Sequence, residues 1–375
     1  MPAQRWGTAA RTLPRPPARV ALLLLLAWLV ACAGPTTAAR SAPAPAAAAT
    51  AAQPGAAATA PSPAPRRVDQ VKIAVPAYGT GAGAILASAT RGYFAEQGIA
   101  AEIVRAPGSV STQAMVADEI QFSASVTPVD SAIARGAPLK VIDIEQEHPA
   151  YSLYARAQIT GPRDLANRIV AVASRGDSGE ISVLKYLRHN GVPTDGVTWI
   201  AVGAGDGKVA AMESGGVDAS PVTWRDIWAL RGAGVLDQLH ELVALYREPY
   251  IQMFYNGVAT SDKLIQTNAD LVQRFANAIA RAHLLLLDPG SKAAVLAVLK
   301  EWEPDRADDD LSGEYDFVLG NLSKEGVISD EAVRESIRTS AEQVGATAEF
   351  TPADFVDFSF IRRAYASLRE QGWQP

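Results

Sequence analysis

Short apolar runs alternate with longer stretches of mixed character along most of the chain. Residues 71–75 (VKIAV) are rich in β-branched side chains and end at Pro76, a pattern typical of a buried parallel strand. A loop of small residues follows at 78–83, and a helical pattern then runs from Ala84 to a stop at Gly98. The same alternation predicts further strands at 100–105, 121–125, 139–144, 169–173, 197–202, 217–220, 242–246 and 251–258.

Helical patterns separate these strands, which indicates an α/β fold with mostly parallel sheets flanked by helices. A second sheet is expected to begin after Tyr151, and the chain returns near residue 252. We therefore predict a first lobe from residues 68–150 plus 252–375 and a second lobe from residues 151–251, joined by two crossings. Further helices, expected to cover the first lobe without contributing chemistry, are predicted at 269–287, 292–302, 313–321, 330–344 and 352–370.

The first residues have the pattern of an export signal. Four arginines and no acidic residue precede an apolar run at 20–30, which is too short to span a bilayer comfortably but suits a signal-peptide core. The run ends in Leu29-Val30-Ala31-Cys32, which resembles the bacterial lipobox. We therefore predict a signal peptide at 1–31, lipidation of Cys32 and attachment to a membrane. The alternative is an ordinary signal peptide cut near residues 31–33. Both predict an exported protein, periplasmic or at the cell surface.

Residues 32–67 are dominated by Ala, Pro, Thr and Ser. Such a composition cannot bury enough apolar surface to offset the entropy of ordering the chain. We therefore expect a disordered tether that holds the folded part away from the membrane.

Composition argues against several classes of function. The net charge is −6 over 375 residues with the signs interspersed, so there is no basic footprint for nucleic acid. Cys32 is the only cysteine, and the mature chain therefore forms no intramolecular disulfide. His148, His189, His240 and His283 stand apart without a paired ligand spacing, so we predict no metal and no cofactor. No histidine adjoins a nucleophile, which predicts that the protein is not an enzyme.

Two motifs compete for the first strand and helix. Gly79, Gly81 and Ala84 match a loose dinucleotide fingerprint, with Glu102 in the next strand, but three residues separate the strand from Gly79 where a tight turn is needed. Residues 91–99 (RGYFAEQGI) instead resemble the G-Y-F-x-x-x-G-I signature of nitrate/sulfonate/taurine-type substrate-binding proteins of ABC importers. That family also contains binders of thiamine-pyrimidine precursors. We favour this second interpretation.

The resemblance implies a two-lobed periplasmic-binding-protein fold, type II-like, in which a cleft closes around a small ligand by hinge motion. It further implies an ABC permease and ATPase as partners, and a monomer. Loops that follow strands are expected to line the cleft. On this chain they supply Tyr78, Gly79, Thr80, Gly81, Ser109, Ser125, Thr127, Ser174, Arg175, Asp177, Ser178 and Trp224.

Each of these residues also has a structural interpretation. Tyr78 and Trp224 can stack on a flat ligand or simply pack on helices. The short hydroxyl side chains can bond turns. Arg175 can hold an oxyanion in two parallel hydrogen bonds, although Asp177 and Glu180 weaken the anion site at the following helix. We therefore expect a small organic ligand, heteroaromatic or oxyanion-bearing, with the heteroaromatic class slightly favoured.

Two other functions stay open at this point. A secreted sensor or scaffold of the same fold would dock on a receptor rather than a transporter. An enzyme resembling the pyrimidine synthases of this fold is the second alternative, but their family pattern contains a cysteine-rich motif that this chain lacks.

Overall fold

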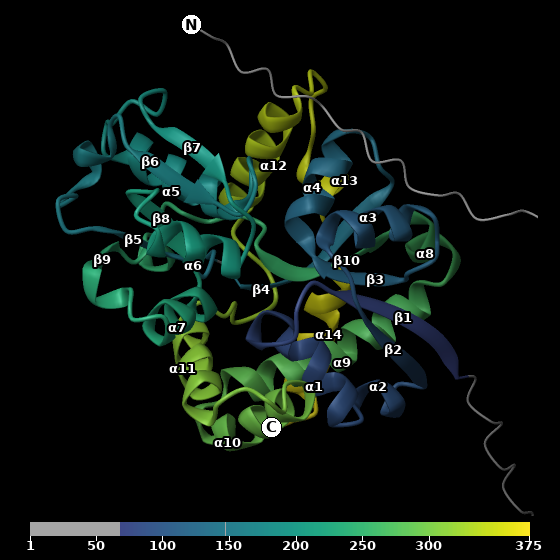
Figure 1. The fold of residues 1–375 in the computed structure, drawn as a ribbon. Coiled ribbons are helices and arrows are strands. Elements are labelled where there is room, and N and C mark those ends of the chain that lie inside the picture. The colour runs from purple at the N-terminus through teal and green to yellow at the C-terminus, as the bar shows by residue number, and fades with distance from the viewer. Residues whose placement is uncertain (1–67, 147) are drawn as a thin grey trace, which may run out of the picture. The chain divides into compact units, whose positions relative to one another are not determined.

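The computed structural model describes residues 68–146 and 148–375, which belong to one compact unit of the chain. The predicted signal peptide, Cys32 and the tether lie outside the described residues. Two five-stranded sheets organise the described part, the first to the right and the second to the left in Figure 1. Helices flank both sheets, so the predicted α/β class is confirmed.

The first sheet has the strand order β2-β1-β3-β10-β4. β1 pairs in parallel with β2 and β3, whereas β10 runs antiparallel to both of its neighbours. The apolar run predicted at 71–75 therefore lies inside a sheet, with Ile73 and Val75 fully buried. The strands are β1 (Asp69–Val75), β2 (Ile99–Arg105), β3 (Phe122–Ser125), β4 (Leu139–Gln146) and β10 (Asn256–Ser261).

The second sheet has the order β7-β6-β8-β5-β9 and is mixed in the same way. β6 runs parallel to β7 and β8, while β5 runs antiparallel to β8 and β9. Its strands are β5 (Ser152–Arg156), β6 (Ile169–Val172), β7 (Thr198–Ala201), β8 (Ala219–Val222) and β9 (Leu239–Val243), and its helices are α5 (Ser178–His189), α6 (Asp206–Glu213) and α7 (Trp224–Gly232). We use first lobe and second lobe for these sheets with their helices.

Helices from both ends of the chain cover the first sheet. A stacked set of rings, Phe94, Phe122 and Phe275, joins β3 to α2 and α9, with centroids 5.3 and 3.7 Å apart. The helices are α1 (Gly83–Thr90), α2 (Tyr93–Glu96), α3 (Gly108–Val116), α4 (Val126–Ala134), α8 (Asp262–Thr267), α9 (Ala269–Leu287), α10 (Lys292–Trp302), α11 (Asp308–Leu319), α12 (Asp330–Val344), α13 (Pro352–Phe355) and α14 (Ser359–Glu370). Short 3₁₀ turns lie at Thr80–Ala82, Pro162–Leu165, Leu236–Gln238, Leu245–Arg247 and Pro289–Ser291.

Several predicted boundaries are wrong for local physical reasons. The helix expected from Ala84 to Gly98 is two helices, because Gly92 adopts a left-handed conformation with φ of 76°. The loop expected after Ser125 is the first turn of α4, where the ring of Pro128 is tolerated. The strand expected at 251–258 begins only at Asn256. Its first residues are apolar because Ile251 and Phe254 are buried in the crossing.

The helices predicted at 269–287, 292–302 and 330–344 are confirmed to the residue. The one predicted at 352–370 is interrupted, because Val356 bridges to Val141 on β4. Within residues 68–146 and 148–375 no single helix has the length and hydrophobicity to cross a membrane. One pair, Ala269–Leu287 with Pro289–Trp302, meets these criteria only jointly and is bent by 87°.

Candidate functional site

A cavity of about 170 Å³ lies where β1 and β4 end and β10 begins. Both lobes line it, since the loop after β1 and helix α11 belong to the first lobe and the start of α7 to the second. Its walls are mostly apolar and aromatic, with a few polar groups among them. The lining residues are Pro76, Ala77, Tyr78, Gly79, Thr80, Gly81, Gln146, Ala150, Thr223, Trp224, Arg225, Tyr255, Asn256, Glu314, Phe317 and Val318.

The loop after β1 brings its main chain, rather than bulky side chains, to the cavity. Gly79 has φ of 137°, and a Cβ there would lie 2.6 Å from a guanidinium nitrogen of Arg225 and 2.8 Å from a carboxylate oxygen of Glu314. Only glycine fits this close approach without displacing both groups. The next residue, Thr80, donates to Glu314 Oε1 from its main-chain N–H (3.2 Å) and from its hydroxyl (2.9 Å).

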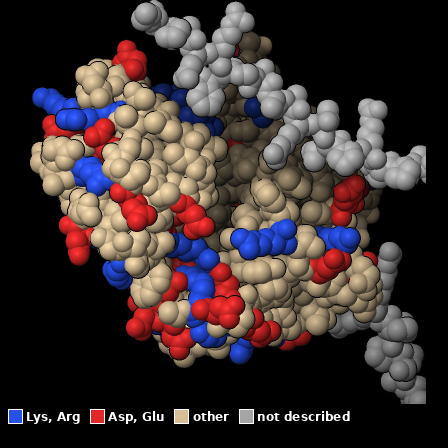
Figure 2. All heavy atoms as spheres, viewed as in Figure 1, with Lys and Arg blue, Asp and Glu red and all other residues tan. Residues whose placement is uncertain are grey.

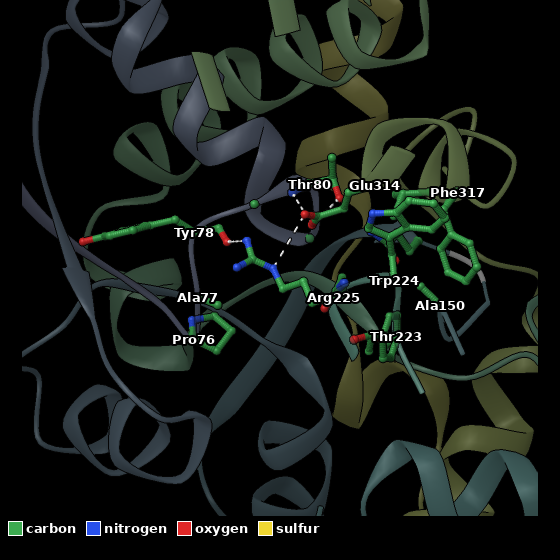
Figure 3. Close-up of a pocket in the computed structure, with 16 residues that line it drawn as sticks. Pro76, Ala77, Tyr78, Thr80, Ala150, Thr223, Trp224, Arg225, Glu314 and Phe317 are labelled. Atoms are coloured by element: carbon green, nitrogen blue, oxygen red, sulfur yellow. Dashed lines mark hydrogen bonds and ion pairs between the residues drawn. The ribbon is translucent and has the colours of Figure 1, made fainter. Parts of the chain in front are cut away.

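Arg225 connects the two lobes across the cavity. It extends from α7 and donates to Glu303 Oε1 at 2.9 Å and to the carbonyl of Tyr78. Its Nε lies 3.6 Å from Glu314 Oε2. Figure 3 shows the guanidinium between the Tyr78 main chain and Glu314. These contacts make Arg225 a link between the lobes. They also use the guanidinium N–H groups that an anionic ligand would need.

A second arginine completes this charge network. Arg306 donates to Asp310 Oδ2 at 2.7 Å, to Glu303 Oε2 at 3.1 Å and to Glu314. Burial by itself lowers the pKa of Arg306, but the three carboxylates outweigh burial and hold that pKa above its ordinary value. Two guanidinium groups thus face three carboxylates. Figure 2 shows charges of both signs gathered over α7, α10 and α11.

Trp224 makes a second contact between lobes at the first turn of α7. Thr223 caps this helix, and the reciprocal hydrogen bonds between Thr223 and Asp226 fix its start. Trp224 Nε1 lies 3.0 Å from both the carbonyl and the Oδ1 atom of Asp310. A Cβ on Gly313 would lie 2.1 Å from the indole, so the ring packs directly on the α11 backbone. Trp224 therefore lines the cavity and packs on a helix at the same time.

Of the residues predicted from the sequence, Tyr78, Gly79, Thr80, Gly81 and Trp224 are brought together around the cavity. The ring of Tyr78, however, packs on Trp302 with centroids 5.2 Å apart and points away from Arg225 in Figure 3. The aromatic rings available to a ligand are therefore those of Trp224, Tyr255 and Phe317. Burial raises the pKa of Tyr255 well above its usual value, so this ring is uncharged.

Three predicted residues of the first lobe do not line this cavity. Ser109 is exposed on the first turn of α3. Thr127 donates its hydroxyl to the Phe254 carbonyl at 3.0 Å and so ties α4 to the crossing. Ser125 is the last residue of β3 and precedes α4, and its buried hydroxyl has no hydrogen-bond partner among the described residues.

The predicted residues of the loop after β6 in the second lobe are also absent from the lining, and the contacts around Ser174–Ser178 explain why. The guanidinium of Arg175 donates to both oxygens of Glu180 at 2.8–3.1 Å, so its fork is occupied. Asp177 accepts from Ser174 N at 2.9 Å and caps α5 through Glu180 N at 2.8 Å. Ser178 lies 3.3 Å from the hydroxyl of Tyr151. Glu180 also accepts from Gly176 N at 2.7 Å.

The sequence interpretation missed Gln146, Asn256, Tyr255, Arg225 and Glu314. Gln146 lies two residues beyond the predicted end of its strand, and the structure extends β4 to include it. A polar residue that continues a buried strand is the signal that could have located it. Glu314 lies on α11, one of the helices expected only to cover the first lobe, and α11 supplies three of the residues that line the cavity.

No metal centre is found in the described part of the chain, where no group of three or more His, Cys, Asp or Glu side chains could hold an ion. The described residues that line the cavity include neither histidine nor cysteine.

Comparison with known proteins gives a family and a fold. Residues 80–291 match the family model described as NMT1/THI5 like. No curated protein sequence matches the chain. Among solved structures, the fold is similar to that of the putative periplasmic sulfonate-binding protein SsuA from Methylobacillus flagellatus KT. The sequence identity is 16%, the TM-score is 0.67, and the alignment covers 82% of this chain and 97% of that one.

Two further structures show the range of proteins that share the fold. The periplasmic nitrate-binding protein NrtA from Synechocystis PCC 6803 is 13% identical with a TM-score of 0.61, covering 80% of this chain and 89% of its own. The desulfurization enzyme DSZB is 17% identical with a TM-score of 0.58, covering 80% of this chain and 99% of its own. Binding proteins and an enzyme thus share this architecture, and at these identities the similarity establishes the fold alone.

Proposed function

The chain belongs to the NMT1/THI5-like family, and we propose that it is an extracytoplasmic solute-binding protein of an ABC importer. It captures a small ligand between its lobes and delivers that ligand to a permease. The observation that carries the proposal is the cavity at the carboxyl edge of the first sheet, lined from both lobes. Ligands bind at this edge in open α/β sheets. The fold similarity to proteins named as sulfonate- and nitrate-binding supports the same role.

The contacts around the cavity provide a way to couple the ligand to lobe position. Arg225 and Trp224 reach from α7 to Glu303 and Asp310 in the first lobe. A ligand that bridges the same two walls adds contacts that exist only when the lobes are together, and it therefore shifts the protein toward the closed form.

We propose binding rather than catalysis. Nucleophilic and acid–base chemistry usually needs a serine, cysteine or carboxylate beside a histidine or another free base. Glu314, the one carboxylate among the described lining residues, is held by Arg306, Arg225 and Thr80. The enzyme DSZB shares the fold, so the fold itself does not decide this point.

We further propose that the mature chain acts as a monomer attached to a membrane through an acylated Cys32. The apolar run that ends at the only cysteine supports this proposal. Mass spectrometry of the exported protein should find acyl chains on Cys32, and Cys32→Ser should leave an unlipidated precursor. A mature N-terminus elsewhere would reject the anchor but not the binding function.

A thermal-shift screen against pyrimidines, carboxamides, sulfonates, carboxylates and nitrate tests the binding function. A compound that binds only the folded protein raises its melting temperature with the logarithm of concentration. Small-angle scattering with the best compound should then report a smaller radius of gyration. Failure of every class would reject the proposal. Uptake of that compound by cells with and without the gene separates an importer from a sensor, which would leave uptake unchanged.

A further inference from the structure

Three polar side chains lie side by side at the edge of the first sheet that borders the cavity. Asn256 on β10 pairs in register with Ser125 on β3 and with Gln146 on β4. Register partners on neighbouring antiparallel strands project to the same face of a sheet. The three residues are in register across the sheet, beside an irregularity in the pairing of β10 that begins at Asn256. We call them the polar row.

The polar row lacks hydrogen-bond partners within residues 68–146 and 148–375. Both polar atoms of the Gln146 side chain and the hydroxyl of Ser125 are buried without a partner. The side chain of Asn256 makes no hydrogen bond there either. Gln146 is 0% exposed and Ser125 is 8% exposed. Folded proteins seldom leave buried amides and hydroxyls unpaired, because the lost hydrogen bonds to water are not replaced.

Gln146 and Asn256 are both among the residues that line the cavity. The amide of Gln146 is closed to water in this conformation, so a ligand contacts it once neighbouring side chains move aside. A glutamine amide offers one acceptor and two donor hydrogens in one plane. A partner that satisfies it must present a donor next to an acceptor. Carboxamides, lactams and related ring edges have this arrangement, whereas a sulfonate or nitrate has acceptors alone.

The charges around the cavity also disfavour an anion. Arg225 is the one basic side chain among the described lining residues, and it is bound to Glu303 and Glu314. With Arg306 and Asp310, the network has one more carboxylate than guanidinium groups. An anionic ligand would meet this surplus negative charge without a free cation to hold it.

The size of the cavity limits the ligand further. An apolar cavity of about 150 Å³ holds one benzene molecule, and this cavity measures about 170 Å³. Trp224, Tyr255 and Phe317 supply aromatic walls against which one flat ring can stack.

We propose that the ligand is an uncharged, single-ring molecule with an amide-type edge, and that Gln146 is the residue that reads this edge. Its Oε1 accepts a ligand N–H and its Nε2 donates to a ligand carbonyl or ring nitrogen, with Asn256 and Ser125 supplying further contacts. This inference rests on the proposed function, because it takes the cavity as the ligand site.

Matched pairs of probes test the ligand class on the mature full-length chain. Calorimetric titrations compare nicotinamide with nicotinate and benzamide with benzoate. Within each pair the ring is the same, and a neutral carboxamide replaces a charged carboxylate. We expect the amide of each pair to bind at least about tenfold more tightly, the effect of one or more charge-dependent contacts. Methanesulfonate and nitrate are titrated alongside and should bind more weakly than the amides.

Tighter binding of the carboxylates, methanesulfonate or nitrate would overturn the inference and leave the proposed function standing. If the amides do not bind but another class from the thermal-shift screen does, the inference is likewise overturned and the proposed function stands. Failure of all classes would overturn both.

One variant of Gln146 and a matched control at another glutamine test its role. Gln146→Met keeps the length of the side chain and removes both polar atoms. It should weaken nicotinamide binding at least about tenfold while the unliganded melting temperature stays equal or rises, since no unpaired amide is then buried. Gln343→Met is the matched control, because Gln343 donates to Gly176 away from the cavity, and its affinity should not change. Unchanged affinity in Gln146→Met, or a lower melting temperature with unchanged affinity, would overturn the role of Gln146.

Discussion

The loop after β1 in the first lobe and the loop after β6 in the second occupy equivalent places, at the carboxyl ends of parallel strands, yet they differ in where their hydrogen bonds go. In the second lobe Arg175, Asp177 and Glu180 satisfy one another and the start of α5. In the first lobe the Tyr78 carbonyl and Thr80 bond to side chains that come from α7 and α11.

This difference separates a structural loop from a binding loop. Polar groups that are paired inside their own loop have no free donor or acceptor for a ligand. The hydrogen bond from Arg225 to the Tyr78 carbonyl depends on how the lobes are placed. Unpaired groups such as the Gln146 amide are the ones with donors and acceptors left for a ligand. Substitutions should therefore change ligand affinity around the first loop and only stability around the second.

Trp224→Ala should have the largest effect. Removing the indole deletes an aromatic wall and the hydrogen bonds to Asp310, so affinity for the best-binding probe should fall by about 1–3 kcal/mol. The free energy of unfolding should also fall, by about 3 kcal/mol or somewhat less for a partly buried ring. Calorimetric titration and denaturant unfolding measure the two. Trp228→Ala, on the same helix but outside the lining, should leave affinity unchanged. Equal affinity in both variants would remove Trp224 from the site.

A pH experiment tests whether every unpaired buried polar group belongs to the ligand site. Asp143, on the same strand as Gln146, is 2% exposed and neither of its side-chain oxygens has a partner among the described residues, but it does not line the cavity. Burial raises the pKa of Asp143 to about 8. Burial and then the charge of Asp143 raise the pKa of Glu145 to about 8. Asp143 is thus explained by a retained proton rather than by a ligand.

The direction in which stability changes with pH follows from the protons bound by the folded and unfolded chains. Between about pH 4 and pH 8 the unfolded carboxyls are ionised while the folded ones keep their protons, so stability falls as the pH rises. His283 nearby has its pKa lowered to about 4 by burial and acts oppositely below about pH 6.5. Tyr365, which also faces Asp143, stays neutral because burial raises its pKa well above the usual value. From pH 6.5 to 8, the proton retained by Asp143 lowers the free energy of unfolding by about 1.4 kcal/mol for each pH unit. Asp143→Asn should remove this contribution and give a shallower slope. Denaturant unfolding at several pH values measures this slope, and an unchanged slope would contradict the assignment.

Substitutions of two helix caps, one away from the cavity and one in its lining, test the same difference with smaller expected effects. Asp177→Ala and Thr223→Ala each remove an N-cap, of α5 and α7 respectively. Each should lower the free energy of unfolding by about 1 kcal/mol. Only Thr223→Ala should also weaken binding, since Thr223 lines the cavity. Loss of affinity in Asp177→Ala would show that the second-lobe loop takes part in binding after all.

Arg175→Ala should have the smallest effect. The side chain of Arg175 is 60% exposed while that of Glu180 is 5% exposed, so water screens part of their ion pair, and its loss should cost under about 1 kcal/mol. Affinity for nitrate or methanesulfonate should be the same in this variant and the original protein. A loss of anion affinity on titration would restore the oxyanion role predicted from the sequence.

The sequence alone determined the fold class and most elements, because apolar periodicity and caps act within a few residues of the chain. The helices at 269–287 and 330–344 and the strand at 71–75 are examples. It also located five of the sixteen lining residues, four of them in the loop of small residues that follows a buried strand. Only the tertiary structure decided which polar residues are left without partners. Asn256 is far in sequence from Ser125 and Gln146, and Glu314 comes from a helix that the sequence predicted only as a cover for the first lobe. Their meeting depends on strand order and on where α11 packs, which are long-range contacts that no local pattern records.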